Sequence, residues 1–263
     1  MARRGRNTGW VPNYHGAWAM VALPPIIGII LGGFTPAHLL LLITWWVGFF
    51  AFFATTTWVK SRRKPKFRKP VVVYSSITLV AGAILLAWYP GLFVWAPAFL
   101  PLMAIAAWET WHRRDRSELS NVVTILAGGL LTPVAFHLSL LAGHEPAGRH
   151  GLDAWPWVWL ATVSITGYFI GTAWYVKTNI RRREDRPFLV FSTAYHVVFA
   201  IFFTYATIQG WMSIFHAIVW WLLAARTWAV ADYGHRKNIR IKPRLIGIGE
   251  IVTTVLIIIG LFL

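Results

Sequence analysis

Nine apolar runs, each about long enough to cross a bilayer, divide this sequence of 263 residues. A transmembrane helix needs roughly 20 predominantly apolar residues, so a chain with this many runs has lipid as its main solvent. The runs are Ala17–Gly33, His38–Val59, Pro70–Trp88, Leu92–Trp108, Asn121–Ala142, Ala154–Val176, Pro187–Tyr205, Trp211–Val230 and Leu245–Leu263. They predict an all-α, polytopic membrane bundle of about nine transmembrane helices, with an N-terminal segment over residues 1–16 and a single helical domain over 17–263.

The third and fourth runs are the least certain part of this topology. Only the turn Tyr89-Pro90-Gly91 separates them, and Pro97 and Pro101 interrupt the fourth run. Proline removes a backbone donor and kinks or ends a helix. Two full helices and one re-entrant element both fit this pattern.

The composition agrees with a membrane protein. Only 13% of the residues are charged and 57% are hydrophobic, whereas a soluble domain carries about 25% charged residues. The chain has no cysteine, which excludes disulfides, thiolate metal sites and thiol catalysis.

The basic residues predict the orientation of the helices. The chain has 25 Lys and Arg against 9 Asp and Glu, and cytoplasmic loops of membrane proteins collect the cations. If nine helices alternate in direction, 23 of the 25 cations fall on one side, in the segments 3–6, 60–69, 113–116, 177–186 and 236–244. The N-terminus is therefore expected in the cytoplasm and the C-terminus outside. Because the cations form short clusters between apolar runs, with no basic domain of their own, no nucleic acid is expected as a partner.

Ionisable side chains inside apolar runs are costly and often functional. The candidates are His137, His196, His216, Arg226 and Glu250. For each histidine, the alternative is a neutral imidazole bonded to a neighbouring helix. Arg226 and Glu250 lie near the cytoplasmic ends of consecutive runs, so an ion pair and a role in binding an anionic headgroup are both open.

A second candidate cluster lies where the chain enters the membrane. The segment Trp10 to Met20 brings Asn13, Tyr14, His15 and Trp18 together. These side chains would suit the mouth of a pocket. An aromatic anchor with a capping asparagine explains them equally well.

Two predicted cytoplasmic loops, 108–121 and 177–187, mix arginines with acids and amides. Arginine can bind phosphate through two parallel hydrogen bonds, and the interleaved acids indicate ordered loops with internal salt bridges. The candidate ligand contacts here are Arg113, Arg114, Asn121, Lys177, Asn179, Arg181 and Arg182. The segment 60–69 has no acid and is interpreted as a lipid-facing basic segment, attracted to anionic headgroups.

The sequence resembles the YwiC-like family of bacterial integral membrane proteins, whose function is uncharacterised. The resemblance extends over nearly the whole chain and rests on the motifs Pro12-Asn13-Tyr14-His15-Gly16-Ala17-Trp18-Ala19-Met20, Arg113-Arg114-Asp115-Arg116-Ser117-Glu118-Leu119-Ser120-Asn121, Tyr195-His196 and Lys242-Pro243-Arg244-Leu245-Ile246-Gly247-Ile248-Gly249-Glu250. It makes His15 and Glu250 leading candidates. It also implies the bacterial cytoplasmic (inner) membrane as the location.

A weaker likeness is to UbiA-type intramembrane prenyltransferases, which have nine spans and a cavity that faces the cytoplasm. Arg113–Asn121 leads into Ala127-Gly128-Gly129 much as the corresponding segment of that family does. The family holds magnesium with two aspartate-rich motifs. Here Thr55–Arg63 contains no acid, and the end of the sixth run offers only Glu184 and Asp185. The likeness therefore implies a UbiA-like architecture without magnesium-dependent prenyl transfer, and no cofactor or metal is predicted.

The sequence favours a membrane protein that binds a polyprenyl or anionic lipid in a cytoplasm-facing cavity, with a metal-independent transferase activity left open. The alternatives are a small-solute transporter or channel, suggested by polar groups within the runs, and a non-catalytic subunit of a membrane complex. A homo-oligomer also fits. The candidate ligand-binding residues are His15, Trp18, Arg113, Arg114, Asn121, Lys177, Asn179, Arg181, Arg182, His196, Arg226 and Glu250. The substrate is not identifiable from the sequence.

Overall fold

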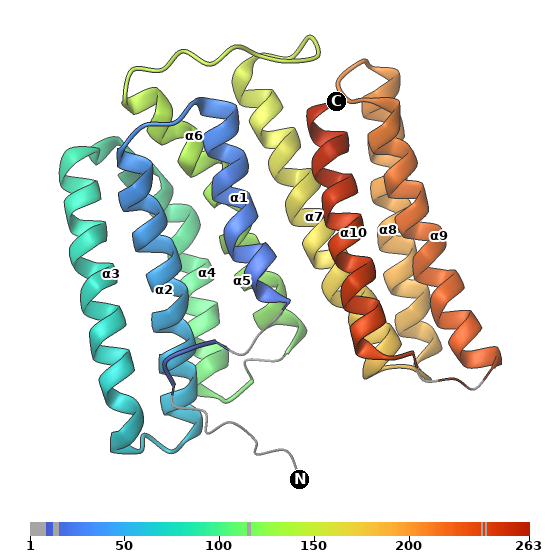
Figure 1. Cartoon of the computed structure of the whole chain (residues 1–263), viewed down its shortest axis with the longest axis horizontal. Helices are drawn as coiled ribbons and strands as arrows, with labels where there is room; N and C mark the ends of the chain where they lie inside the picture. Colours follow the sequence, from blue (N-terminus) through green and yellow to red (C-terminus); the bar gives the residue numbers. More distant parts are fainter. Residues whose placement is uncertain (1–8, 13–15, 115–116, 238, 240) are drawn as a thin grey trace. The chain divides into compact units, whose positions relative to one another are not determined.

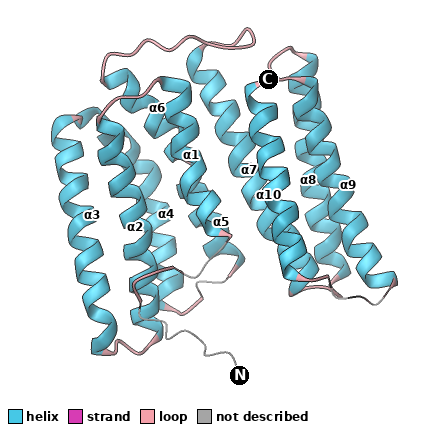
Figure 2. Ribbon diagram, in the orientation of Figure 1, coloured by secondary structure: helices cyan, strands magenta, loops and turns pink. Residues whose placement is uncertain are grey.

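The computed structural model describes residues 9–12, 16–114, 117–237, 239 and 241–263. These residues form α-helices with short connections and no β-strand, apart from one isolated bridge between Arg149 and Leu152 (Figure 2). The predicted all-α, polytopic architecture is confirmed. The helices group into two compact units, Met1–Pro146 and Ala147–Leu263. That these units act as the single domain predicted over 17–263 stays a prediction.

The first unit contains six α-helices and two short 3-10 helices (Figure 1). In chain order they are α1 (Ala17–Gly32), α2 (Ala37–Lys60), η1 (Pro65–Phe67), α3 (Arg68–Trp88), η2 (Pro90–Trp95), α4 (Ala96–Trp111), α5 (Glu118–Gly129) and α6 (Leu131–Leu141). The uncertain third and fourth runs are thus two separate helices, α3 and α4, joined by η2.

The second unit contains four long helices. They are α7 (Ala154–Ile180), α8 (Arg186–Ile208), α9 (Ile214–Arg236) and α10 (Pro243–Phe262). Every predicted run therefore coincides with one helix, except the fifth, which forms both α5 and α6.

Seven helical segments of the described chain are long and apolar enough to cross a membrane. The two remaining predicted spans fall short for different reasons. Helix α1 has only 16 residues. Helix α7 has 27 residues, but it is not among the seven, and several of its buried residues are serine, threonine or asparagine.

Pro133 explains why the fifth run forms two helices. A proline at position 133 cannot donate a hydrogen bond to the carbonyl of residue 129, four residues earlier. Helix α5 ends at Gly129, and α6 begins at Leu131, after one residue outside both helices. The predicted span over Asn121–Ala142 therefore remains one candidate span, Glu118–Leu141, with this break inside it.

Helix α1 shows how the protein compensates for two prolines inside the membrane. Pro25 leaves the carbonyl of Val21 without its helical donor, and the indole Nε1 of Trp45 on α2 donates to that carbonyl at 2.9 Å. Thr132 Oγ1 on α6 donates to the carbonyl of Pro24 at 3.0 Å. Neighbouring helices therefore replace or supplement main-chain hydrogen bonds, as lipid cannot.

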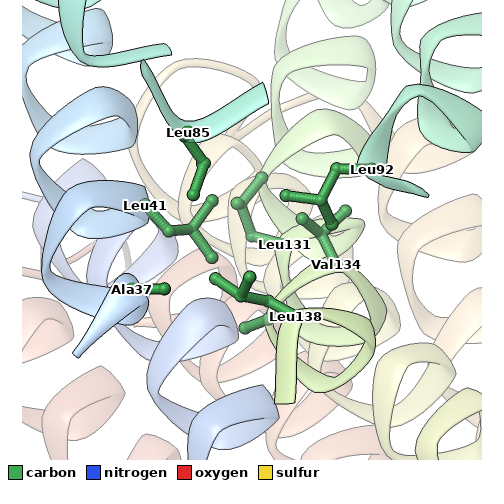
Figure 3. Close-up of a cluster of buried hydrophobic side chains, with 8 residues drawn as sticks. Ala37, Leu41, Leu85, Leu92, Leu131, Val134 and Leu138 are labelled. Carbon is green, nitrogen blue, oxygen red and sulfur yellow. The ribbon is translucent and has the colours of Figure 1, made fainter. Parts of the chain in front are cut away.

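The core of the first unit lies between α2, α3, η2 and α6 (Figure 3). Its buried residues are Ala37, Leu41, Leu85, Leu92, Leu131, Val134, Ala135 and Leu138. Leu138 and Ala135 have no exposed surface. This packing fixes the N-terminal part of α2 against α6, at the opposite end of α2 from Arg62 and Arg63.

Within each unit the basic loops lie at one end (Figure 1). In the first unit these are the α2–α3 and α4–α5 connections, and in the second the α7–α8 and α9–α10 connections. We refer to these as the basic ends. The clustering agrees with the alternation of charge along the sequence, which is the pattern that positive loops produce in membrane proteins.

Substituting Gly28 should separate α1 from α6. A Cβ atom on Gly28 would lie 2.1 Å from the backbone oxygen of Thr132, so the two helices would have to move apart. We expect Gly28→Ala to lower the free energy of unfolding by about 1–3 kcal/mol, measured by thermal unfolding in detergent. Gly247→Ala is the control, because a Cβ there meets nothing within 4 Å. Equal effects of both substitutions would contradict the close packing described for Gly28.

Candidate functional site

An arginine-lined cavity lies at the basic end of the first unit, between the ends of α2 and α4. It has a volume of about 440 Å³ and is lined by Val59, Arg62, Arg63, Trp111 and Arg113. None of these lining residues is acidic. The guanidinium carbon of Arg63 lies 4.5 Å from the centre of the Trp111 ring, so a cation–π contact connects the two helix ends. The cavity, which we call the arginine cavity, combines three cations with one aromatic and one aliphatic side chain.

The backbone at the end of α2 places two consecutive arginines in this cavity. After Lys60 the chain turns at Ser61, and the main-chain nitrogen of Arg63 donates to the carbonyl of Trp58 at 2.9 Å. Arg62 and Arg63 both have φ of 59°. This left-handed conformation costs non-glycine residues roughly 1–2 kcal/mol each. The strain is tolerated at both positions although glycine would avoid it.

Helix α4 ends in the same way. Arg113 has φ of 60°, and the nitrogen of Arg114 donates to the carbonyl of Glu109 at 2.7 Å. Glycine is the usual residue at such a helix end. All three arginines of the cavity therefore occupy strained backbone positions. Strain of this kind persists where the surroundings enforce it, and it concentrates at functional sites.

Glu109 and Ser117 connect the end of α4 to the start of α5. Glu109 is only 4% exposed, and its carboxylate accepts a hydrogen bond of 2.5 Å from the Ser117 hydroxyl. The same hydroxyl oxygen accepts from the main-chain nitrogen of Ser120 and so caps α5. In the described residues of the predicted loop 108–121, a buried acid and a helix cap therefore join the end of α4 to the start of α5.

A second charged site lies inside the second unit. Arg226 on α9 and Glu250 on α10 form an ion pair of 2.7 Å between Nη1 and Oε1, with side chains 17% and 13% exposed. The pair lies about 10–15 Å from the basic end of its helices, at 1.5 Å per residue. The ion pair considered from the sequence is thus present.

Helix α7 completes the surroundings of this pair. The other carboxylate oxygen of Glu250 accepts from Thr172 Oγ1 at 2.7 Å and from the Tyr168 hydroxyl at 3.3 Å. Arg226 also donates to Thr253 Oγ1 at 3.2 Å, and its guanidinium carbon lies 4.1 Å from the ring centre of Tyr175. Arg226 Nε and Nη2 are buried without a hydrogen-bond partner in the described chain, so the ring of Tyr175 supplies part of the stabilisation that hydrogen bonds would give.

The histidines inside the helices have partners from the protein. His196 Nδ1 lies 2.7 Å from the carbonyl of Ser192, and Trp95 donates to His137 Nδ1 at 3.1 Å. His216 Nε2 lies 2.9 Å from the Ser164 hydroxyl and accepts from Trp220 Nε1 at 3.1 Å. These contacts are those that the neutral, structural alternative predicts.

The remaining candidate residues are spread over both units. Trp18 makes edge-to-face contacts with Phe49 and Phe50, as an aromatic anchor would. Asn179 donates to the carbonyl of Tyr175 within its own helix. Arg182 pairs with Asp185 at 3.3 Å, an internal salt bridge of the kind expected in this loop.

Four further candidates lie outside the arginine cavity. Arg114 and Arg181 are exposed, Asn121 and Lys177 are partly buried, and none of the four lines the arginine cavity. His15 lies outside the described residues.

Several residues of these sites were not singled out in the sequence. Arg62 and Arg63 were interpreted only as part of a lipid-facing segment, yet they line the cavity with Arg113. Tyr168, Thr172 and Tyr175 recur every three or four residues on α7, and this helical spacing was the one available signal that they share a face. Among the described residues, no group of three or more His, Asp or Glu could hold a metal ion.

A double-mutant cycle should separate the buried pair from a surface pair on the same helix. We expect Arg226→Met and Glu250→Met each to lower the free energy of unfolding by about 3–5 kcal/mol, and the double variant to lose less than their sum. Glu250→Met should lower the free energy of unfolding more than Arg226→Met does. The arginine left alone in Glu250→Met cannot lose its charge, whereas the glutamate left alone in Arg226→Met keeps the Thr172 and Tyr168 donors. Unfolding in detergent measures all four proteins.

The control for this cycle is the pair Arg236–Asp232, 2.6 Å apart with the arginine 74% exposed. Its coupling energy should stay below about 1 kcal/mol. Similar coupling energies in both cycles would show that burial adds nothing to the Arg226–Glu250 pair.

Comparison with known proteins supports the resemblance stated from the sequence. A family model described as YwiC-like protein matches residues 11–136, which include the arginine cavity. An uncharacterised protein YwiC of Bacillus subtilis is 26% identical over 230 residues, covering 85% of this chain and 90% of the relative. An uncharacterised protein of Haemophilus influenzae is 24% identical over 195 residues, covering 73% and 76%. No solved structure matches. The resemblance to the YwiC-like family is therefore confirmed, and the chain has a helical, membrane-type architecture.

Proposed function

We propose that this protein binds a phosphate-bearing, anionic lipid through the arginine cavity. The observation that carries the proposal is the convergence of Arg62, Arg63 and Arg113 from two helix ends on one cavity without an acidic lining residue. The left-handed backbone at all three positions supports it further, because glycine would be the less strained choice if only the helix ends mattered.

The chemistry of the lining favours a phosphate over other anions of the membrane surface. Guanidinium groups bind phosphate oxygens in pairs, and they are more weakly hydrated than ammonium groups. Trp111 is 62% exposed beside them, as tryptophans at the headgroup level of membranes commonly are. A headgroup in the cavity would have its acyl or polyprenyl chain in the adjoining lipid. Both kinds of anionic lipid remain within the proposal, including the polyprenyl lipids that a UbiA-like protein would bind.

The orientation in the membrane is part of this proposal. The basic ends would face the cytoplasm, with the N-terminus inside and the C-terminus outside, in the cytoplasmic membrane of a bacterium. Positive loops support this orientation, and the cytoplasmic leaflet is the one that presents anionic headgroups to them. Each basic residue near such a surface contributes about 1 kcal/mol of attraction, which would concentrate lipid phosphate near the cavity.

Removing the three arginines should abolish lipid-dependent stabilisation. A ligand present at 100 times its dissociation constant stabilises the folded state by about 2.7 kcal/mol. We expect phosphatidylglycerol and a polyprenyl phosphate, but not phosphatidylcholine, to raise the thermal midpoint of the purified protein. The variant Arg62→Gln/Arg63→Gln/Arg113→Gln should lose most of that rise.

The matched control removes three exposed charges that lie outside the cavity. Lys66 lies in η1, Arg68 and Lys69 are the first residues of α3, and all three are exposed. Lys66→Gln/Arg68→Gln/Lys69→Gln therefore changes the net charge by the same amount. It should keep the lipid response. If both triple variants lost it equally, general attraction to the membrane surface would explain the binding and the proposed site would be refuted.

Arg113→Gly should stabilise the protein while weakening lipid binding. Glycine adopts the φ of 60° seen at this position without the steric cost, so unfolding should require about 1 kcal/mol more. Arg114→Gly is the control: its φ is not in the left-handed region, and glycine there should destabilise by about 0.5–1 kcal/mol. Thermal unfolding with and without phosphatidylglycerol measures both effects. A less stable Arg113→Gly variant with an unchanged lipid response would contradict the proposal.

A further inference from the structure

We infer that the arginine cavity selects lipids whose headgroup ends in a phosphate monoester over lipids whose phosphate is a diester. This inference rests on the proposed function and adds the class of headgroup. It follows from the number of guanidinium groups around one cavity and from the absence of an acid among the residues that line it.

The number of donors exceeds what a diester can use. Each guanidinium carries five N–H donors, and three of these groups line the cavity. A phosphodiester has two oxygens free of ester bonds, so three arginines would have to share them. A monoester has three terminal oxygens, all strong acceptors. Only the monoester offers an oxygen to each of Arg62, Arg63 and Arg113.

The cation–π contact of Arg63 leaves its donors available. Its guanidinium carbon lies over the Trp111 ring, 4.5 Å from the ring centre. The guanidinium carries five N–H donors, and no hydrogen bond is needed for the contact with the ring. Trp111 therefore orients Arg63 without using the hydrogen bonds that a phosphate needs.

The charge balance points to the same headgroup. Neither Arg62, Arg63 nor Arg113 makes an ion pair with an acid in the described parts of the chain. A diester brings one negative charge, whereas a monoester brings about 1.5 to 2 at pH 7, because its second pKa is about 6. The monoester therefore neutralises more of the mutual repulsion of the three arginines.

Several charged groups outside the lining also lie on the elements that form the cavity. Arginine stays charged throughout the accessible pH range. Glu109 is buried and bonded to Ser117, and the His112 ring stacks on Trp108 at 4.1 Å between centres. The described charged or titratable groups on α2, η1 and α4 and in the turns that follow α2 and α4, outside the lining, are His38, Lys60, Lys64, Lys66, Glu109, His112 and Arg114. Asp115 lies outside the described residues.

The direction of the pH effect distinguishes the ligand from these groups. As the pH falls through about 6, a monoester gains a proton and loses one negative charge, so its binding should weaken toward that of a diester. A change in the charge of the protein would alter the binding of both headgroups in the same direction. The diester measured over the same pH range therefore reports any contribution from the protein.

The experiment compares soluble short-chain lipids on the purified full-length protein in detergent. The probes are dioctanoyl phosphatidic acid as monoester, dioctanoyl phosphatidylglycerol as diester, and inorganic phosphate, each titrated at pH 7.5 and pH 5. We expect phosphatidic acid to bind on the order of tenfold more tightly than phosphatidylglycerol at pH 7.5, the equivalent of one additional charged hydrogen bond. At pH 5 the ratio should approach one.

Single substitutions test whether the third arginine makes the difference. Arg113→Gln should reduce the affinity for phosphatidic acid to near that for phosphatidylglycerol, and Arg113→Lys should restore it only in part, because lysine keeps the charge but not the paired donors. Arg68→Gln is the control, since Arg68 is exposed and outside the cavity. It should leave the tenfold ratio unchanged.

Each other outcome overturns a defined statement. Equal affinities for the two lipids at pH 7.5, both lost in the triple arginine variant, would refute monoester selection and leave the proposed lipid site intact. A ratio that persists at pH 5 would also refute it. Binding of both lipids that does not depend on the three arginines would refute the proposed function itself. Inorganic phosphate binding as tightly as phosphatidic acid would show that the ligand is free phosphate and not a lipid.

Discussion

Main-chain polar groups in hydrocarbon must find their partners within the protein, and this constraint accounts for much of the structure. Pro25 removes a donor inside α1, and Trp45 on α2 supplies the replacement to Val21. His38 Nε2 lies 2.9 Å from the carbonyl of Ala135 on α6, while its Nδ1 accepts from the nitrogen of Thr35. An unsatisfied polar group costs several kcal/mol in lipid. These side chains therefore determine which helices can be neighbours, and apolar packing then fills the space between them.

The two charged sites follow the same constraint in opposite ways. Arg226 lies among helices and is neutralised by Glu250, with hydroxyl groups and an aromatic ring around both. Arg62, Arg63 and Arg113 lie at helix ends, where water and headgroups can solvate them. A paired charge inside the second unit contributes to the position of its helices, whereas the three arginines have no acidic partner among the described residues. The polar groups that suggested a transport pathway, which are His137, His196, His216 and Arg226, each have a hydrogen-bond or ion-pair partner within the protein.

The sequence predicted the elements of this fold better than their details. Apolar runs and basic clusters locate the helices, because both signals depend only on local composition. The Arg226–Glu250 pair was foreseeable because the two residues lie at a similar depth on consecutive runs. Which way a helix faces is decided by packing, so the contribution of Tyr168 and Thr172 to that pair was not predicted. The arginine cavity was missed for a similar reason. Nothing in the letters of residues 60–69 reveals that Arg62 and Arg63 adopt left-handed backbone and turn back toward α4.

Helix α7 has a consequence for how the second unit is made. Its 27 residues are mostly buried by neighbours, and several of the buried residues carry hydroxyl groups. Thr162, Thr178 and Asn179 return their polar groups to carbonyls four residues earlier, but the Ser164 and Thr172 hydroxyls bond to α9 and α10. During synthesis α7 emerges before those partners. The Ser164 and Thr172 hydroxyls therefore gain these partners only after α9 and α10 have been made.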